Sequence, residues 1–258
     1  MNDHSVHQEI KEFLKSENRS EKKLSVTRCS AHAYMLQMSE EVLDEMDLEK
    51  YKTSEEGRRR LNPAVNNYRE AVIPDCGFLD WEVVASALKS DPSNLRELKV
   101  VDDLQDSVVE LLSSGLKSPN CRLETLRLSE CRLSEISWAA LISALKSNPS
   151  HLKELNLSNN DLQDSGVKLL RDLLESPDCR LEKLGLINCS LSEISCAALI
   201  SALKSNPSHL RDLDLRLNKL KDSGVKLLRD LLESPDCRLE TLGINDEKIT
   251  ATIQKKCE

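Results

Sequence analysis

Histidine and cysteine are the side chains of this sequence that could carry nucleophilic chemistry. His151 and His209 each precede a predicted strand, and Cys196 lies within a predicted helix. A thiolate beside an imidazole is the usual arrangement of a cysteine nucleophile and its base. However, the two histidines occupy one phase of a sequence repeat, and Trp138 stands at the position of Cys196 in the sister repeat. We therefore interpret these positions as structural and predict that the chain is not an enzyme.

The spacing of the other residues that could bind a metal or a nucleotide does not support such a site. His4, His7 and Cys29 lack the spacing of a metal site. None of the seven glycines begins the pattern G-x-x-x-x-G-K-[ST], which cradles the phosphates of a nucleotide. We predict no metal, no cofactor and no nucleotide-binding site in this chain.

The nine cysteines follow the sequence repeat rather than a disulfide framework. Cys121, Cys179 and Cys237 share one phase, and Cys131 shares another with Cys189 and Cys76. Equivalent positions of stacked units face their own neighbours, which suits small buried thiols in a reducing compartment. This pattern predicts core packing in a cytoplasmic protein.

Composition and charge exclude several functional classes. The net charge is −8, and no basic face emerges that would indicate binding to nucleic acid or to anionic lipid. The N-terminus lacks a signal-peptide pattern, and no apolar stretch is long enough to span a membrane. Aromatic residues make up only 3% of the chain, so repeated aliphatic side chains must fill the core.

A leucine-rich repeat organises most of the chain. Its units begin at leucines spaced 29 residues apart, except for a first step of 28: Leu95, Leu123, Leu152, Leu181, Leu210 and Leu239. Each unit opens with L-x-x-L-x-L or a close variant, whose alternation predicts a strand with leucines facing inward. The units alternate between two kinds, so the true period is a pair of 58 residues.

Helices should follow each strand, because apolar residues recur there at spacings of three and four. We expect Asp164 or Ser165 to cap the helix of one kind of unit and Ser192 to cap the other, with Pro177 and Pro207 ending them.

Asparagine and cysteine alternate at the ninth position of the unit, where the chain leaves the strand. Asn160 and Asn218 alternate there with Cys131 and Cys189. A buried Asn can satisfy backbone groups of a turn, and Cys fits the same small volume, so we predict a structural role.

The pattern weakens upstream. A strand is expected from Leu43 and another from Tyr68, followed by a helix near residues 81–88. Two helical patterns, around 6–15 and 26–38, precede them. We divide the chain into a helical linker or cap (1–42), degenerate repeats (43–94), and regular repeats ending in a partial unit (95–258).

The motif Asp164-Ser165-Gly166-Val167-Lys168-Leu169-Leu170, alternating with Cys189-x-Leu191-Ser192-Glu193, resembles the C-terminal leucine-rich repeats of NOD-like receptors, particularly the expanded fish set. Ribonuclease inhibitor shares this architecture. The resemblance implies an α/β solenoid, a horseshoe arc with parallel strands on the concave face, helices on the convex face and an N-terminal helical cap. The NACHT ATPase and the signalling domain of such receptors have no counterpart here, so we expect either a fragment or a short gene product.

Outward-facing strand residues should form one continuous concave face. This candidate binding face comprises Glu97, Lys99, Thr125, Arg127, Glu154, Asn156, Lys183, Asp212, Asp214 and Thr241. Its mixed charge argues against a small apolar ligand, so a protein partner is expected. The family resemblance favours the sensing or autoinhibitory arm of an innate-immune receptor. The alternative is a ribonuclease-inhibitor-like protein that wraps and blocks an enzyme, although basic residues interrupt the acidic groove that such a partner would need.

Overall fold

The computed structural model describes residues 25–38, 42–47, 53–73, 81–100, 103–148, 151–206, 209–235, 237–245 and 247–251. Its strands are β1 (Leu43–Asp47), β2 (Tyr68–Ile73), β3 (Glu97–Val100), β4 (Thr125–Leu128), β5 (Glu154–Asn156), β6 (Lys183–Gly185), β7 (Asp212–Asp214), β8 (Thr241–Ile244) and β9 (Glu247–Thr250). Its helices are α2 (Val26–Met38), α3 (Glu55–Leu61), α4 (Trp81–Lys89), α5 (Asp106–Leu116), α6 (Glu135–Ser147), α7 (Gln163–Leu174), α8 (Glu193–Ser205) and α9 (Asp222–Leu232), with a 3-10 helix η1 (Asn62–Asn67).

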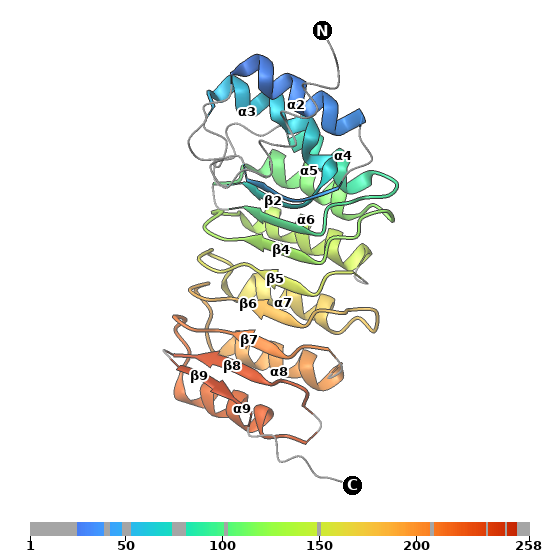
Figure 1. The fold of residues 1–258 in the computed structure, drawn as a ribbon. Helices are drawn as coiled ribbons and strands as arrows, with labels where there is room; N and C mark the ends of the chain where they lie inside the picture. The colour runs from blue at the N-terminus through green and yellow to red at the C-terminus, as the bar shows by residue number, and fades with distance from the viewer. Residues whose placement is uncertain are drawn as a thin grey trace.

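The strands form one sheet in chain order, and β1 to β8 are parallel to their neighbours. The helices that follow the strands lie together behind the sheet, so the described chain is a two-layered stack with its ends at opposite poles (Figure 1). Packed helices are spaced about 8–10 Å apart, whereas paired strands are spaced about 4.8 Å apart. A stack of such units therefore bends toward its strands, which form the inner side. The solenoid expected from the sequence is confirmed.

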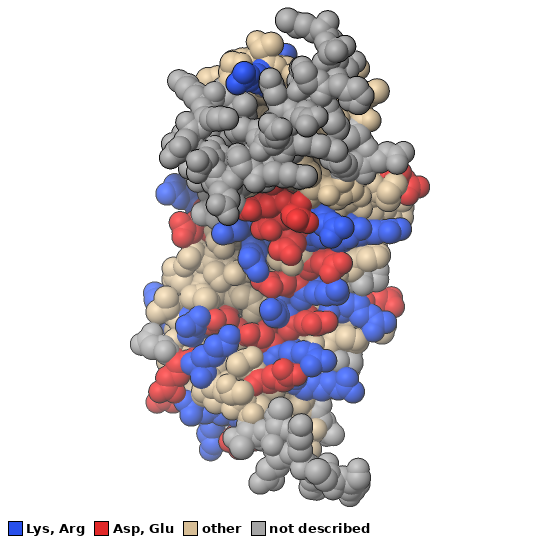
Figure 2. Space-filling view, in the orientation of Figure 1, with Lys and Arg blue, Asp and Glu red and all other residues tan. Residues whose placement is uncertain are grey.

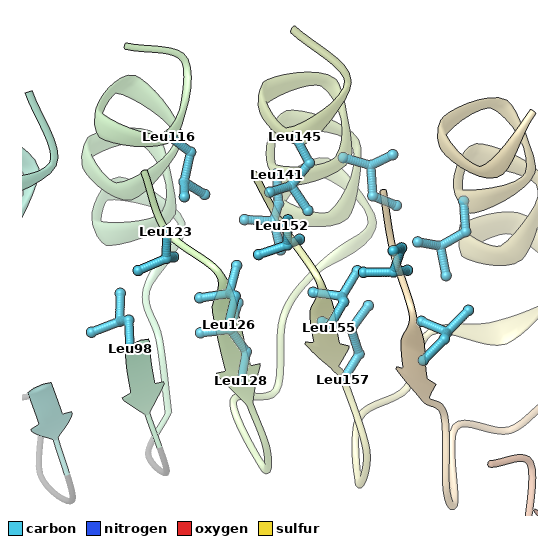
Figure 3. Close-up of a cluster of buried hydrophobic side chains, with 14 of the residues drawn as sticks. Leu98, Leu116, Leu123, Leu126, Leu128, Leu141, Leu145, Leu152, Leu155 and Leu157 are labelled. Carbon is cyan, nitrogen blue, oxygen red and sulfur yellow. The ribbon is translucent and has the colours of Figure 1, made fainter. Parts of the chain in front are cut away.

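A ladder of leucines fills the space between the two layers. Leu98, Leu126 and Leu155 occupy equivalent positions in adjacent strands and are fully buried. Figure 3 shows these side chains pointing from the strands toward the helices. Because each unit repeats the same inward positions, the core is continuous along the stack rather than gathered at one centre.

The N-terminal end contains the helix and strands that the weaker sequence pattern predicts. Helix α2 lies at the N-terminal end of the stack (Figure 1) and buries Cys29 and Leu36. Asn67 Nδ2 donates to the carbonyl of Leu36 at 2.7 Å, which ties α2 to η1. Strands β1 and β2 begin at Leu43 and Tyr68, as expected, and the predicted helix near 6–15 lies outside the described residues. The three-part domain division stays a prediction.

The C-terminal end contains a strand that the sequence analysis missed. Strand β9 runs antiparallel to β8, with Ile249 opposite Leu242, and thereby covers the last parallel edge. Asn245, with φ 52°, follows β8 and starts the reversal. An exposed sheet edge invites pairing with another chain, and β9 takes the edge position of the described sheet with the charged residues Glu247 and Lys248.

The asparagine positions perform the role predicted for them. Asn160 Nδ2 donates to the carbonyl oxygens of Leu128, Leu157 and Ser158 at 2.7, 2.9 and 3.2 Å, and Oδ1 accepts from the backbone N–H of Cys131 at 2.9 Å. Asn160 is 4% exposed. One side chain therefore supplies the missing partners of two consecutive turns.

Asn218 forms the same arrangement in the next pair of units, 58 residues further along the chain. Its Nδ2 donates to the carbonyls of Leu186, Leu215 and Arg216, and its Oδ1 accepts from the backbone N–H groups of Cys189 and Leu191. The bonds to Leu186 and Cys189 cross from one unit to the next, so the asparagine also links neighbouring units.

The helix caps are predicted correctly in one kind of unit only. Ser192 caps α8 by accepting from the backbone N–H of Ile194 at 3.2 Å. Helix α7 has no side-chain cap, so the expected capping by Asp164 or Ser165 is wrong. Helix α7 ends at Leu174, three residues before Pro177, and Pro207 lies outside the described residues.

Asp164 instead reaches across to the next unit. It accepts from the hydroxyls of Ser192 and Ser195 and from their backbone N–H groups. Asp106 repeats the two hydroxyl contacts with Ser134 and Ser137. Periodicity within one helix could not reveal a contact whose partners lie 28 to 31 residues away.

The hydrogen bonds that Asp164 accepts from the next unit predict that the stability of the fold depends on pH. Burial raises the pKa of Asp164, but the hydrogen bonds from Ser192 and Ser195 outweigh it, so the folded-state pKa lies below the ordinary value of 3.8. A carboxylate with a lowered folded pKa stabilises the fold above its unfolded pKa, and that contribution is lost as the pH falls through the folded pKa. We expect Asp164→Asn to lower the free energy of unfolding at pH 7 by about 1–2 kcal/mol. Its loss of stability below about pH 5 should also be shallower than in the wild type.

Urea unfolding between pH 3 and pH 7 measures both effects. Asp222→Asn is the matched control, because Asp222 occupies the same phase but is exposed, and its side chain forms no hydrogen bond within the described part of the chain. Equal pH slopes for Asp164→Asn and the wild type would contradict the assignment.

Candidate functional site

The face of the sheet opposite the helices carries the predicted binding residues, and we call it the open sheet face. Strand register places its side chains in two columns that cross the strands. The first column contains Glu70, Glu97, Thr125, Glu154, Lys183, Asp212 and Thr241. The second contains Val72, Lys99, Arg127, Asn156, Gly185, Asp214 and Gly243. All ten predicted residues therefore lie on one continuous surface, and none of them is buried.

Ion pairs between neighbouring strands neutralise the middle of this face. Arg127 Nε lies 2.8 Å from Glu154 Oε1, and Lys183 Nζ lies 3.8 Å from Glu154 Oε2. The hydrogen bond with Glu154 raises the pKa of Arg127, and the charges of Glu97 and Glu70 add to the effect. Glu154 is thus shared by two cations and is less available to a partner than its sequence position suggests.

The C-terminal acidic residues are also paired. Asp214 binds Arg216 through two oxygens, with the shortest distance 2.7 Å, and Lys248 of β9 lies 3.0 Å from Asp212. The side chain of Asp214 is only 13% exposed. The acidic groove that the sequence offered here is therefore largely neutralised by two cations that the sequence analysis did not assign to this face.

Glu97 and Lys99 of β3 differ from the other charged members of the face. Within the described residues, neither forms an ion pair, and Lys99 is exposed. Two further carboxylates, Glu70 and Glu45, occupy the neighbouring registers of the same column. Figure 2 shows the acidic side chains gathered on the N-terminal part of the face, beyond which basic and acidic stripes alternate. The N-terminal part of the face therefore carries three carboxylates in successive registers, Glu45, Glu70 and Glu97.

Two glycines keep the face flat beside polar side chains. A Cβ atom at Gly185 would lie 2.9 Å from the Asn156 side chain, and one at Gly243 would collide with the carboxylate of Asp214. The side chains of Asn156 and Asp214 therefore lie over the glycines of the next unit.

A third column of charges borders the face at the second position of each strand motif. Its signs alternate along the array: Arg96, Glu124, Lys153, Glu182, Arg211 and Glu240. Lys153 Nζ lies 2.7 Å from Glu124 Oε2, and Arg211 lies 2.7 Å from Glu240. Because the two kinds of unit alternate, the charged residue at this position of each unit lies next to a residue of opposite charge in the neighbouring unit.

Sequence reasoning missed Glu45, Glu70, Arg216, Lys248 and the alternating border column. The first two stand at the third position of the degenerate motifs beginning at Leu43 and Tyr68, so aligning those motifs could have found them. Arg216 and Lys248 lie outside the strand motif, and only the structure shows where they fold back.

The residues considered for enzyme chemistry lie apart from this face. Cys196 is fully buried in α8, and burial raises the pKa of its thiol to about 11, which disfavours the reactive thiolate. His209 contacts Arg180 at 2.9 Å. Within the described ranges, no group of three or more His, Cys, Asp or Glu side chains could hold a metal ion. No helix there is long and apolar enough to cross a membrane.

The described cysteines are free thiols, and all except the half-buried Cys237 are buried. Burial raises the pKa of Cys189 to about 12. Core packing, as predicted from the phase of these cysteines, is confirmed for the described ones, and Cys76 lies outside the described residues.

Comparison with known proteins identifies repeats of the same kind. The family described as Leucine Rich repeat matches residues 148–170 and 206–228. Pig ribonuclease inhibitor is 34% identical over 85 residues, which are 32% of this chain and 19% of that protein. Mouse NACHT, LRR and PYD domains-containing protein 12 is 48% identical over 67 residues, which are 26% of this chain and 6% of that protein. The aligned parts thus span a fifth or less of these relatives.

A solved structure gives a distant likeness. The crystal structure of a TLR13–ssRNA13 complex aligns with 81% of this chain and 33% of that chain, at a TM-score of 0.36 and 16% sequence identity.

Proposed function

We propose that this chain is a leucine-rich-repeat region of the NOD-like-receptor type with ribonuclease-inhibitor-like repeats, and that it binds a protein partner through its open sheet face. The fold and the relatives point to a non-catalytic interaction module. More specifically, it acts as the ligand-sensing or autoinhibitory arm of a receptor in innate-immune signalling, in the cytoplasm. The homology to a NACHT protein supports this role.

One observation supports the proposal that a protein partner binds to the open sheet face. Parallel strands from β2 to β8 present two continuous columns of mostly polar residues, and the helices cover only the other face. Such an extended, rigid surface with both charged and uncharged side chains suits the binding of a folded protein. A small apolar ligand would instead need a concave apolar pocket.

Exchanging the charges of Glu97 and Lys99 tests this surface most sharply. Neither residue forms an ion pair within the described residues, so Glu97→Lys with Lys99→Glu alters the face without breaking an ion pair or changing the net charge. A photo-crosslinking amino acid at Thr125, on the adjacent strand β4, should give a discrete adduct with a partner in cells. We expect the charge exchange to reduce the yield of that adduct severalfold.

The matched control is the exchange Lys226→Glu with Asp230→Lys on α9, where both side chains are exposed. This variant should keep the adduct at the wild-type yield. Loss of the adduct in the control but not in the Glu97/Lys99 variant would move the binding surface to the helices.

The second candidate function is inhibition of an enzyme by wrapping it. Homology to ribonuclease inhibitor favours this function, whereas the pairing of Asp212 and Asp214 with cations weakens the acidic groove that a basic ribonuclease would need. Nanomolar inhibition of a pancreatic-type ribonuclease by the purified chain would place this function first. No inhibition at micromolar protein would remove it.

A further inference from the structure

A cavity of about 320 Å³ lies outside the open sheet face, between the loops that follow β4 and β5. The first loop contributes Arg132 and Ser134, and the second contributes Asp161. Helix α6 contributes Glu135 and Trp138, and α7 contributes its first residue, Gln163.

One residue that lines the cavity carries a buried donor without a partner. Trp138 is 1% exposed, and within the described residues its indole Nε1 has no hydrogen-bond acceptor. A buried N–H group without a partner is destabilising, and native structures rarely keep one without a reason. A carbonyl oxygen entering the cavity would supply the missing acceptor.

The chain contains a nearly identical unit in which this site is built differently. Residues 133–147 and 191–205 match at every position except one, where Trp138 is replaced by Cys196. In that sister unit, Lys221 Nζ lies 2.8 Å from Glu193 Oε1, and Ser223 donates to Glu193 Oε2. The sister site therefore contains its own cation.

The cavity next to Trp138 lacks this cation. Gln163 stands where the sister unit has Lys221, and Asp161 stands where it has Lys219. Gln163 turns to Asp161 at 2.8 Å, and Glu135 forms no ion pair within the described chain. Relative to its sister, the cavity has gained one carboxylate and lost two ammonium groups.

We propose that this cavity binds a lysine or arginine side chain of a protein partner. The cationic group lies between Glu135 and Asp161, and a backbone carbonyl of the same segment accepts from Trp138 Nε1. The inference rests on the proposed function, because it assumes that the ligand is a protein. The cavity is nevertheless a separate site from the open sheet face. The sister unit supports it, because Glu193 at the equivalent position already holds an ammonium group and its pKa is lowered by the hydrogen bond from Lys221.

Two local features oppose a cation, and neither outweighs the carboxylates. Arg132 lines the cavity, but its side chain is 82% exposed and its guanidinium lies 3.6 Å from Asp103, which offsets its charge. Glu135 begins helix α6, whose N-terminus favours anions. Glu193 begins α8 in the same way and nevertheless binds Lys221.

Titration of the full chain with Nα-acetyl-lysine N-methylamide tests the proposal, with the two tryptophan indole N–H signals observed by NMR. The Trp138 signal, assigned with Trp138→Phe, should move saturably at millimolar ligand, because the probe carries both the ammonium and the carbonyl. The signal of Trp81, which lies in α4, should stay fixed and serves as the internal reference. The norleucine analogue, which lacks the charge, should bind at least tenfold more weakly.

Variants separate the charge effect from a general disturbance. Glu135→Gln with Asp161→Asn should weaken binding at least tenfold, whereas Glu193→Gln in the sister unit should leave it unchanged. No movement of the Trp138 signal at the solubility limit, or equal movement with the norleucine analogue, would overturn the proposal. Because the probe is a free amino-acid derivative, this result does not depend on whether the open sheet face binds a partner.

Discussion

Replacing Asn160 with alanine should lower the free energy of unfolding by about 3 kcal/mol, which would be among the largest effects of any polar substitution in this chain. The side chain is 4% exposed and is the partner of three carbonyl oxygens and of the backbone N–H of Cys131. Alanine would leave several of these buried groups unsatisfied, and each such group costs about 1–3 kcal/mol unless water replaces the lost partner.

Urea denaturation followed by circular dichroism measures this loss. Asn159→Gly is the matched control, because Asn159 is the adjacent residue and is exposed, with side-chain contacts of 3.2 and 3.4 Å to Asn188 and Glu130, and its φ of 58° is one that glycine adopts without strain. We expect a change below about 0.5 kcal/mol for this control. Similar losses for both variants would show that the turn is not held by the Asn160 side chain.

Leu155→Ala should destabilise the chain by about 3–4 kcal/mol through a cavity in the leucine ladder. Leu155 is fully buried in β5, between Leu126 of β4 and Leu184 of β6. A solenoid transmits stability through its nearest neighbours, so a defect in a central unit weakens the interfaces on both sides. We therefore expect a lower unfolding midpoint and a broader transition.

Ile136→Ala provides the control for loss of aliphatic volume, because Ile136 is 75% exposed. Its effect should stay within about 0.5 kcal/mol. Hydrogen exchange would locate the defect, since the amides of β4, β5 and β6 should lose more protection than those of β1. Uniform loss of protection along the array would instead indicate that the chain unfolds as a single cooperative unit.

The degenerate repeats show why only part of the fold could be predicted with ease. Strand β2 has Ala71 where the regular units have leucine, yet Ala71 is buried and pairs in register with Leu98. The strand was still recognisable because Cys76 shares the phase of Cys131, which places the start of the strand at Tyr68. Strand β9 could not be found in this way, because it belongs to no repeat and exists through its pairing with β8.

The sequence by itself determined the period, the two kinds of unit, the positions of the parallel strands and the ten outward side chains of the candidate face. These follow from local rules, since the alternation along a strand decides which side chains face the helices. It also identified Asn160 and Asn218 as structural residues, because their phase in the repeat was visible.

Only the tertiary structure decided which of the outward charges remain available. Glu154 is neutralised by cations on both neighbouring strands, and Asp214 by Arg216 from the loop that follows its own strand. Asp164 looked like a helix cap and is instead a contact between units. The physical reason is distance in sequence: these partners come together through the stacking of units or the folding back of loops, and no local pattern records which side chains then meet.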